Sequence, residues 1–316
     1  MEEKLMQEDV FSINGVARKN LKLISQEQSA VLEARACELS FIADEIAEKA
    51  IELMSEGLTV LDVMSVLSEQ IADMSCEKAS SGVLPESFLN SFLASCEGVD
   101  AALFVKLLAE RLCERGVTVS EVDFLPPEQS AQTFTYVRNA LADEAYDVFT
   151  QDFDDPRVFY SSSFREACVA VADGKCGYCI LPFEERGGVR VPIISELASR
   201  LDLKISAVTP VFGFEGTADM KYALLKRGFV IPPRDEDTDR YLELKLDFDT
   251  GTISKLLPIA ESLGADLYRI NTLGDFDGAF VSLILRDRGE GFAPILSYLT
   301  LFCNNYVPIG IYKNLE

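Results

Sequence analysis

The sequence predicts an α+β multidomain chain with an all-helical region over residues 1–119, a central α/β lobe over 120–231 and a C-terminal ferredoxin-like domain over 241–316. Three observations lead to this division. Apolar residues recur at helical spacing in the first part, short apolar runs alternate with helical stretches in the second, and strand and helix periods follow in the order βαββαβ in the third. With 316 residues, 48% of them apolar, the chain can bury more than one core.

Three apolar stripes with residues three or four apart predict amphipathic helices in the N-terminal region. They are Ile42, Ile46, Ala50 and Leu53; Val60, Met64, Leu67 and Ile71; and Phe104, Leu107, Leu108 and Leu112. Gly57 marks the end of one helix, and Thr59 with Asp62 three residues later has the pattern of a capping box. Pro85 stands where a further helix begins. We therefore expect roughly four helices in this region.

The central part changes to short apolar runs separated by helical stretches. The runs are 122–125, 158–160, 178–183, 205–214 and 222–225. Such alternation predicts an α/β unit with a largely parallel sheet. Residues 232–239 then combine two prolines with a charge run and no apolar residue, which predicts a solvated linker and a domain boundary.

The C-terminal part begins with leucines that alternate with charged residues, a pattern typical of a half-buried strand with its polar side chains in solvent. Later segments continue the order as helix, strand, strand, helix, strand. They are 253–260, 266–272, 279–285, 292–299 and 307–311. This order, in about 75 residues, is the ferredoxin-like plan.

The charge balance excludes several classes of function. The chain has 52 acidic and 29 basic residues, a formal charge of −23, so we expect no general binding to nucleic acid or to anionic membranes. It contains no histidine, which excludes imidazole nucleophile activation and imidazole metal ligands. The first ten residues lack the features of a secretory signal and no apolar run approaches ~18 residues, so a cytoplasmic protein is expected.

Eight cysteines are scattered along the chain, as expected for reduced thiols in a reducing compartment. Only Cys176 and Cys179 have CxxC spacing. A zinc or redox site needs a second ligand pair or an activating environment, so the favoured interpretation is two small apolar residues in a buried strand. We expect no metal and no cofactor.

Several motifs in the central lobe resemble those of the prephenate dehydratase family. Residues 164–174 and 177–185 are similar to that family's "phenylalanine, helix, strand, Pro-Ile-Glu-Asn-Ser" signature, and 124–128 with 133–135 are similar to its opening "Leu-Gly-Pro-Glu-Gly-Thr-Phe-Ser". The resemblance implies a lobe of the periplasmic-binding-protein type. Members of the family remove water and carbon dioxide from prephenate in a cleft between two such lobes, which yields phenylpyruvate.

The resemblance implies five candidate catalytic residues if the chain is active: Thr133, Thr135, Glu184, Arg186 and Lys221. The threonines stand for proton donors, and Lys221 or Arg186 for an anion clamp. The family's Thr-Arg-Phe triplet aligns with Met-Lys-Tyr at 220–222, so the expected acid is a methionine here. The run 205–214 also leads almost directly into the returning strand, where the family inserts a second lobe.

The opening of the first helix in the C-terminal domain resembles an ACT domain, a small-molecule sensor attached to amino-acid biosynthetic enzymes. The resemblance implies amino-acid binding at Gly251, Thr252, Ile253, Asn271 and Thr272. The arginine of the family's Glu-Ser-Arg-Pro pattern is missing. The alternative is a domain that only dimerises by side-by-side sheet packing, and a homodimer through this domain is expected in either case.

The N-terminal helices occupy the position where fused family members carry a chorismate mutase, and residues 107–111 are similar to its first helix. A mutase must hold a dicarboxylate with several cations. The region offers Arg35, Lys49, Arg111 and Arg115 among many acids and without the expected spacing, so a working mutase is disfavoured.

Three functional hypotheses follow. The favoured one is a degenerate relative of prephenate dehydratase that binds a small molecule, an amino acid or an aromatic-pathway metabolite, and has a regulatory role. The second is an active dehydratase whose missing lobe is replaced by the helical region. The third is a structural or interaction module in which Glu184 and Glu185 are only a solvated strand end.

Overall fold

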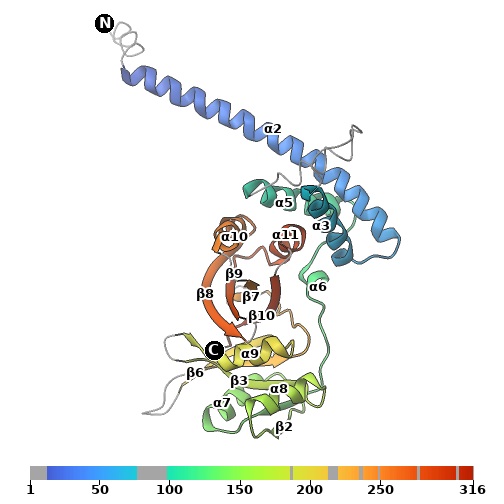
Figure 1. The fold of residues 1–316 in the computed structure, drawn as a ribbon, viewed down its shortest axis with the longest axis vertical. Helices are drawn as coiled ribbons and strands as arrows, with labels where there is room; N and C mark the ends of the chain where they lie inside the picture. The colour runs from blue at the N-terminus through green and yellow to red at the C-terminus, as the bar shows by residue number, and fades with distance from the viewer. Residues whose placement is uncertain are drawn as a thin grey trace.

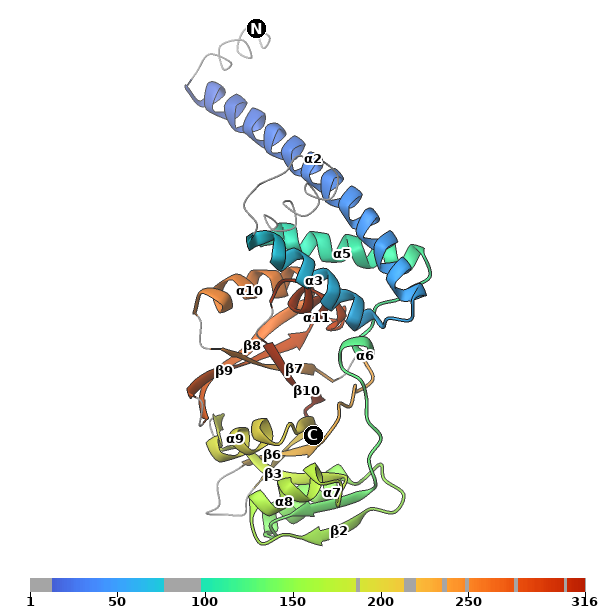
Figure 2. The same cartoon turned by 45° about the vertical axis from the view of Figure 1, so that its right-hand side comes forward.

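The computed structural model describes residues 13–76, 98–185, 188–212, 220–234, 238–247, 250–275, 278–303 and 306–315. Figures 1 and 2 show the elements stacked along one axis, with the N-terminal helices at one end, the central lobe at the other and the C-terminal elements between them. The chain has a mixed α/β fold built on one large mixed sheet.

Helices α2 (Ile13–Ser55), α3 (Val60–Cys76) and α5 (Val99–Glu114) form the N-terminal layer. Gly57, with φ +100°, follows the end of α2 in a conformation that favours glycine. The hydrogen bonds of the expected capping box are present, because Thr59 N donates to Asp62 Oδ2 at 3.0 Å and Asp62 N to Thr59 Oγ1 at 3.2 Å. Pro85 lies outside the described residues.

Helix α2 has 43 residues and is therefore roughly 65 Å long at 1.5 Å per residue. Its N-terminal part extends beyond the rest of the molecule in both views (Figures 1 and 2). The C-terminal part packs on α5 and α3, and its buried residues include Leu39, Ile42 and Ala50. Only this part of the helix contributes to the described core.

The run 122–125 was expected to be a strand, and this prediction is wrong. Residues Glu121–Phe124 form a short helix, α6. Ser120 and Asp123 explain the difference, because the Asp123 carboxylate accepts hydrogen bonds from both the backbone N–H and the hydroxyl of Ser120 at 2.7 Å. This local bonding favours a helical turn over a strand.

The central lobe combines a parallel and an antiparallel part. Its elements are β1 (Thr133–Tyr136), α7 (Ala140–Phe149), β2 (Arg157–Tyr160), α8 (Phe164–Ala172), β3 (Tyr178–Glu185), β4 (Val189–Arg190), α9 (Pro192–Arg200), β5 (Lys204–Val211) and β6 (Met220–Lys226). Strand β1 pairs in parallel with β2 and β3, whereas β6 pairs antiparallel with both β3 and β5. The expectation of a largely parallel sheet is therefore wrong for β5 and β6, since the short connection between them leaves no room for the crossover helix that parallel strands need.

The C-terminal elements follow in the order βαββαβ. They are β7 (Arg240–Asp247), α10 (Thr250–Ser262), β8 (Ala265–Asp275), β9 (Gly278–Asp287), α11 (Ala293–Phe302) and β10 (Tyr306–Lys313). Their strands lie side by side as β10-β7-β9-β8, with every neighbouring pair antiparallel. The first and last strands in sequence are thus neighbours, and β8 forms the free edge.

Backbone pairing joins this sheet to the lobe. Strand β10 pairs in parallel with β5 where Gly310 faces Ile205, so the described strands form a single ten-stranded sheet. A Cβ atom on Gly310 would lie 2.3 Å from the carbonyl oxygen of Ile205, which explains why the close approach needs a glycine. The lobe and the C-terminal elements are therefore continuous through their backbones.

Both faces of the C-terminal sheet are covered. One face packs with α10 and α11 on the N-terminal helices, in a core that includes Leu244, Leu283 and Leu285. The other face contributes Tyr241, Ile284 and Tyr312 to a core shared with α8 and α9. The polar residues on this second face consequently lie inside the molecule, where the lobe meets the C-terminal strands.

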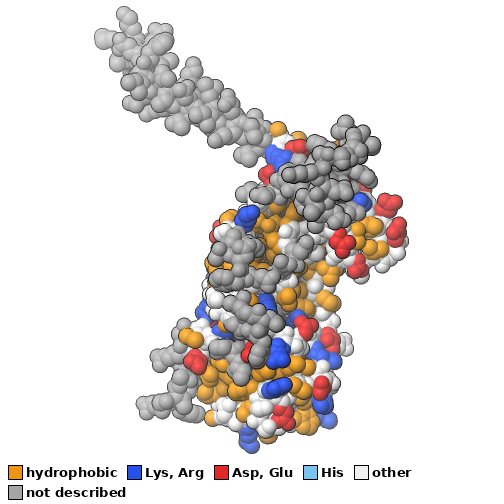
Figure 3. Space-filling view, viewed as in Figure 1, with side chains coloured by type: hydrophobic (Ala, Val, Ile, Leu, Met, Phe, Trp, Pro, Cys, Tyr) orange, Lys and Arg blue, Asp and Glu red, His pale blue; other side chains and the backbone are white. Residues whose placement is uncertain are grey.

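The surface shows mixed character. Figure 3 shows acidic side chains gathered at the helical end, whereas lysines and arginines are interspersed with acidic and apolar side chains over the lobe. Within the described part of the chain, each helix is too short or too polar to cross a membrane.

Candidate functional site

The two candidate threonines on β1 both hold parts of the lobe together. The Thr133 hydroxyl accepts a hydrogen bond from the backbone N–H of Gly177 at 2.8 Å. Thr135 is buried, and its hydroxyl lies 2.7 Å from that of Ser161 at the end of β2. Each hydroxyl therefore has a structural partner within the lobe.

Glu184 and Lys221 are brought together by the pairing of β3 with β6. The Glu184 side chain is only 5% exposed, and its carboxylate lies 3.6 Å from Lys221 Nζ. Arg269 from β8 donates to the same carboxylate at 2.9 Å, and Arg190 from β4 lies 3.7 Å away. Three cations thus surround one buried carboxylate, and one of them comes from the C-terminal sheet.

The contacts continue to a second buried carboxylate. Arg190 donates to Glu243 Oε2 at 3.1 Å, and the side chains are 3% and 2% exposed. The hydroxyls of Ser282 and Tyr312 donate to Glu243 at 2.7 and 3.1 Å. We call this set the junction network; its members are Glu184, Arg190, Lys221, Glu243, Arg269, Ser282 and Tyr312.

Two members of the junction network have pKa values shifted by their surroundings, Arg190 and Tyr312. Burial works against the charge of the Arg190 guanidinium, but the carboxylates of Glu243 and Glu184 outweigh it and raise the pKa of Arg190. The guanidinium also lies 3.5 Å above the centre of the Phe183 ring. Burial, and next to it the Glu243 carboxylate, raises the pKa of Tyr312 well above its usual value. Tyr312 therefore stays protonated and continues to donate to Glu243.

The threonines and Glu184 occupy separate parts of the sheet. Thr135 is opposite Cys179 on β3, and Glu184 lies five residues further along that strand. At about 3.3 Å per residue the separation is roughly 16 Å. The candidate proton donors on β1 therefore lie well apart, along the sheet, from the pair of Glu184 and Lys221. Arg186, the other candidate clamp, lies outside the described residues.

The candidate ligand residues of the C-terminal domain lie on different faces. Gly251 and Thr252 lie in the first turn of α10, and half-buried Ile253 follows them. Asn271 is opposite Ser282 on β9 and so faces the lobe, whereas exposed Thr272 is opposite Val281 and faces the helices. The structure thus separates Asn271 from Thr272.

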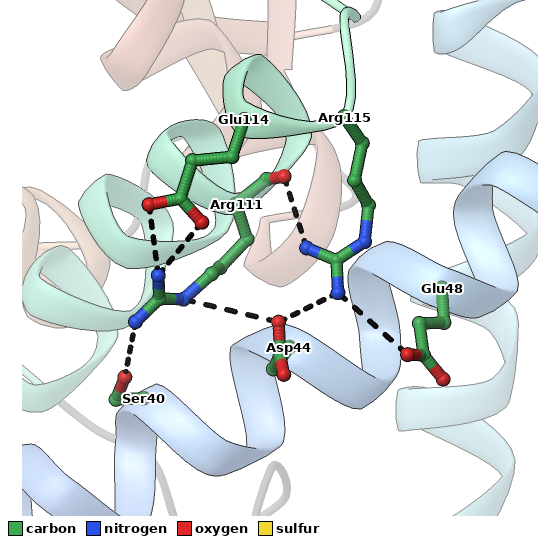
Figure 4. A network of polar contacts seen from close by, with 6 residues as sticks. All are labelled: Ser40, Asp44, Glu48, Arg111, Glu114 and Arg115. Carbon is green, nitrogen blue, oxygen red and sulfur yellow. Dashed lines mark hydrogen bonds and ion pairs between the residues drawn. The ribbon is translucent and has the colours of Figure 1, made fainter.

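Three arginines of the N-terminal region are bound by polar side chains of the protein, and Figure 4 shows the contacts of Arg111 and Arg115. Arg111 donates to Glu114 at 2.8 Å and to Ser40 at 2.9 Å. Arg115 donates to Asp44 at 2.7 Å. Arg35 likewise donates to Asp100 at 2.9 Å, while Lys49 is half-buried on α2. These guanidinium groups fasten α2 to α5, and their charges are balanced by the protein itself.

The cysteines of the CxxC pair are buried next to a third cysteine. Burial raises the pKa of Cys176. A hydrogen bond with Cys168, together with burial, raises the pKa of Cys179. Thiols with raised pKa values are poor nucleophiles and poor metal ligands. Within the described residues, no group of three or more cysteine, aspartate and glutamate side chains could hold a metal ion.

Sequence reasoning missed five members of the junction network, namely Arg190, Glu243, Arg269, Ser282 and Tyr312. Glu243 alternates with leucines on β7, a pattern that predicts exposure, and yet it is buried because α9 and the lobe cover that face. The sequence around a charged residue in such a strand does not indicate whether another part of the chain covers the polar face of the strand. The contact between distant segments decides the outcome.

Comparison with known proteins gives likeness in structure alone: no family model matches the chain, and no curated protein matches it. The chain is similar to the X-ray structure of prephenate dehydratase from Streptococcus mutans, with 16% identity, coverage of 59% of this chain and 100% of that one, and a TM-score of 0.49. The structural neighbours include further prephenate dehydratases. One is the enzyme from Arthrobacter aurescens in complex with L-Phe, with 11% identity, 57% and 89% coverage and a TM-score of 0.42.

Another similar structure is described as GqqA, a novel type of quorum quenching acylase. Its identity is 17%, its coverage 58% of this chain and 96% of that chain, and its TM-score 0.44. These likenesses concern the fold and assign no activity to this chain.

Proposed function

We propose that the protein is a relative of prephenate dehydratases that lacks dehydratase activity and serves as a small-molecule-binding or regulatory protein. One observation carries the proposal. Glu184, the carboxylate retained from the family's second motif, is buried and bound by Arg190, Arg269 and Lys221. Loss of water and carbon dioxide from prephenate needs cations that are available to hold the two substrate carboxylates. Here the cations are held by the protein's own carboxylates.

The arrangement of the lobe supports the same proposal. A dehydratase site needs an enclosure that excludes water around the substrate. In this chain the sheet continues from β5 into β10, so the C-terminal strands lie beside the lobe and their Arg269 contacts Glu184. The hydroxyl groups of Thr133 and Thr135 are engaged elsewhere in the lobe.

An activity assay tests the absence of catalysis. The purified full-length protein is incubated with prephenate, and phenylpyruvate is followed by its absorbance beside an authentic prephenate dehydratase. We expect phenylpyruvate to form only at the spontaneous rate of the reaction without protein. Protein-dependent formation that is lost in Thr135→Val would contradict the proposal and establish the active dehydratase.

The regulatory half of the proposal concerns the C-terminal elements. We propose that they act as an ACT-like domain and form a homodimer through the edge of β8. Leu267, Tyr268 and Ile270 on this strand are each about two-fifths exposed. A strand of 11 residues at the edge of a sheet also presents unpaired backbone groups, which a second β8 can satisfy around a two-fold axis.

Sedimentation equilibrium tests the dimer. The unmodified protein is expected to sediment as a dimer and Ile270→Lys as a monomer, because the new charges would face each other across the two-fold axis. Val122→Lys is the matched control, since Val122 is exposed on α6, away from β8. A monomeric unmodified protein, or a dimer unaffected by Ile270→Lys, would contradict this interface.

A further inference from the structure

One side of helix α2 carries a line of exposed residues. They recur every three or four positions and therefore share one face of the helix, which we call the outer face: Ala34, Cys37, Phe41, Glu45 and Glu48. Phe41 is 62% exposed. The core residues Leu39 and Ile46 belong to the opposite face, so a second helix can lie on the outer face without displacing α3 or α5.

The sequence continues this line towards the N-terminus of α2. At the same spacing it has Ala30, Glu27, Leu23, Lys19 and Val16, three of which are apolar. This part of the helix extends beyond the rest of the molecule (Figures 1 and 2). A helix in water owes most of its stability to the packing of an apolar face, so residues 16–30 are suited to pack on another helix.

The outer face is complementary to itself when two copies of α2 run antiparallel. With the central alanines next to a two-fold axis, the facing pairs are Ala30 with Ala34, Leu23 with Phe41, and Lys19 with Glu45. The symmetry forms each of these pairs twice. Small residues at the centre let the two helices approach closely, and an apolar pair and an ion pair then follow on both sides of the centre.

The distribution of charge along α2 favours the antiparallel orientation. Residues 13–32 contain three basic residues and one acidic residue, whereas residues 33–55 contain six acidic residues and two basic ones. An antiparallel pair places the positive part of one helix along the negative part of the other, and a parallel pair places like charges side by side. The acidic side chains that Figure 3 shows at the helical end add to this attraction.

We propose that the outer face of α2 binds residues 16–30 of the α2 helix of a second copy, in an antiparallel pair around a two-fold axis. The contact goes beyond the proposed function and does not depend on it, because it uses a surface apart from the β8 edge. Exposed ion pairs contribute little, and the central side chains are small. The contact is therefore expected to be weaker than the pairing of two β8 strands and to form at higher protein concentration, where it joins dimers into larger assemblies.

Sedimentation equilibrium of the full-length Ile270→Lys variant isolates this contact, because the new lysine is expected to prevent pairing through β8. We expect a monomer at the concentrations that test the β8 edge and a dimer as the protein concentration approaches about 1 mM. Phe41→Lys in this background is expected to weaken the association at least tenfold, because a charge replaces the apolar contact with Leu23. Phe159→Lys is the matched control, since Phe159 is also exposed but lies on β2 of the lobe.

An exchange of charges tests which residues face each other. Glu45→Lys is expected to weaken the association several-fold, and the addition of Lys19→Glu to the same chain is expected to restore it. Glu56→Lys makes the same change of charge beyond the end of α2, at an exposed position, and is expected to have little effect.

Cross-linking tests the orientation. The axes of packed helices lie about 8–10 Å apart, within reach of a short bismaleimide. Glu27→Cys places a thiol opposite the exposed Cys37 of the second copy, so this variant is expected to be cross-linked into a dimer. The cross-link is expected to disappear when Cys37→Ser is added. A parallel pair would instead place Cys37 opposite Cys37 and would be cross-linked in the unmodified protein.

Three results would overturn the proposal. They are an Ile270→Lys variant that stays monomeric at every concentration, equal effects of Phe41→Lys and Phe159→Lys, and cross-linking of the unmodified protein through Cys37. If Phe41→Lys fails to fold, the exchange of charges decides the question, because a pair that Lys19→Glu does not restore contradicts the contact. The β8 dimer is tested by the unmodified protein at low concentration, so the two interfaces can fail separately.

Discussion

Replacing Arg190 by methionine is expected to lower the free energy of unfolding by about 3–5 kcal/mol, the usual cost of removing one partner from a buried ion pair. The substitution keeps an unbranched side chain of similar length and removes the charge. Arg190 lies 3.1 Å from Glu243 and 3.7 Å from Glu184. After the change, Glu184 keeps Arg269 at 2.9 Å, whereas the named partners of Glu243 are the neutral hydroxyl donors Ser282 and Tyr312.

Most of the loss is therefore expected to come from Glu243, a carboxylate that is 2% exposed. Loss of the cation above Phe183 adds about 1–2 kcal/mol, part of which the methionine side chain offsets by packing on the same ring. If this reasoning is correct, Glu243→Gln in the Arg190→Met background restores part of the stability. The coupling energy of the double variant is expected to exceed about 2 kcal/mol.

Urea unfolding followed by circular dichroism measures these differences. Arg157→Met is the matched control, because Arg157 and its partner Asp155 are both more than two-thirds exposed and an exposed pair contributes about 0–1 kcal/mol. A loss below about 1 kcal/mol for Arg190→Met, or a double variant whose effect is the sum of the single effects, would refute the reasoning.

Three further predictions concern the rest of the fold. Thr59→Ala is expected to lower the free energy of unfolding, measured with urea, by about 1 kcal/mol, because it removes the acceptor for Asp62 N. Thr59→Ser keeps this acceptor and is expected to retain most of the stability. Equal losses in the two variants would contradict the role of Thr59 as the helix cap. Burial, and next to it a nearby aspartate, raises the pKa of Tyr241 to about 12. The stability that depends on this proton is therefore complete below pH ~10 and decreases between there and about 12, by roughly 2–3 kcal/mol. Tyr241→Phe is expected to make the free energy of unfolding depend less on pH over that range. An unchanged slope of stability against pH would contradict the role of Tyr241. Gly310→Ala is expected to lower the free energy of unfolding by at least about 1–3 kcal/mol, because the new Cβ would lie 2.3 Å from the Ile205 carbonyl oxygen. An unchanged midpoint of urea unfolding would contradict the close pairing of β10 with β5.

Local patterns in the sequence were sufficient to predict most of the individual elements. The alternating leucines of β7 and the capping box at Thr59 depend only on residues close to them in the sequence. The structure therefore has the strand and the start of the helix where these patterns predicted them. The turn at Glu121–Phe124 was mistaken for a strand because an apolar run of four residues carries no periodicity that distinguishes the two.

Pairing between distant segments could not be predicted in the same way. The contact of β10 with β5 at Gly310 depends on the close approach of two backbones. In the sequence, the glycine alone is a sign that such an approach is possible. The burial of Glu243 depends on that same junction, since α9 covers the polar face of β7 once the sheets are joined. The structure brings together the candidate residues Glu184 and Lys221, while Arg190 and Arg269, which also pair with Glu184, carried no signal in the sequence.

Under the proposed function, the junction network also explains how the Glu184 carboxylate can persist without a reaction to perform. A buried glutamate is tolerated only when cations and hydrogen-bond donors compensate for its lost hydration. In an enzyme, substrate and a second lobe would supply part of that environment. In this chain Arg269 comes from the C-terminal sheet, and with Arg190 and Lys221 it surrounds Glu184 permanently. Under the proposed function, the same contacts that make Glu184 stable keep it from a dianionic substrate, so structural use and catalytic use of this carboxylate exclude each other.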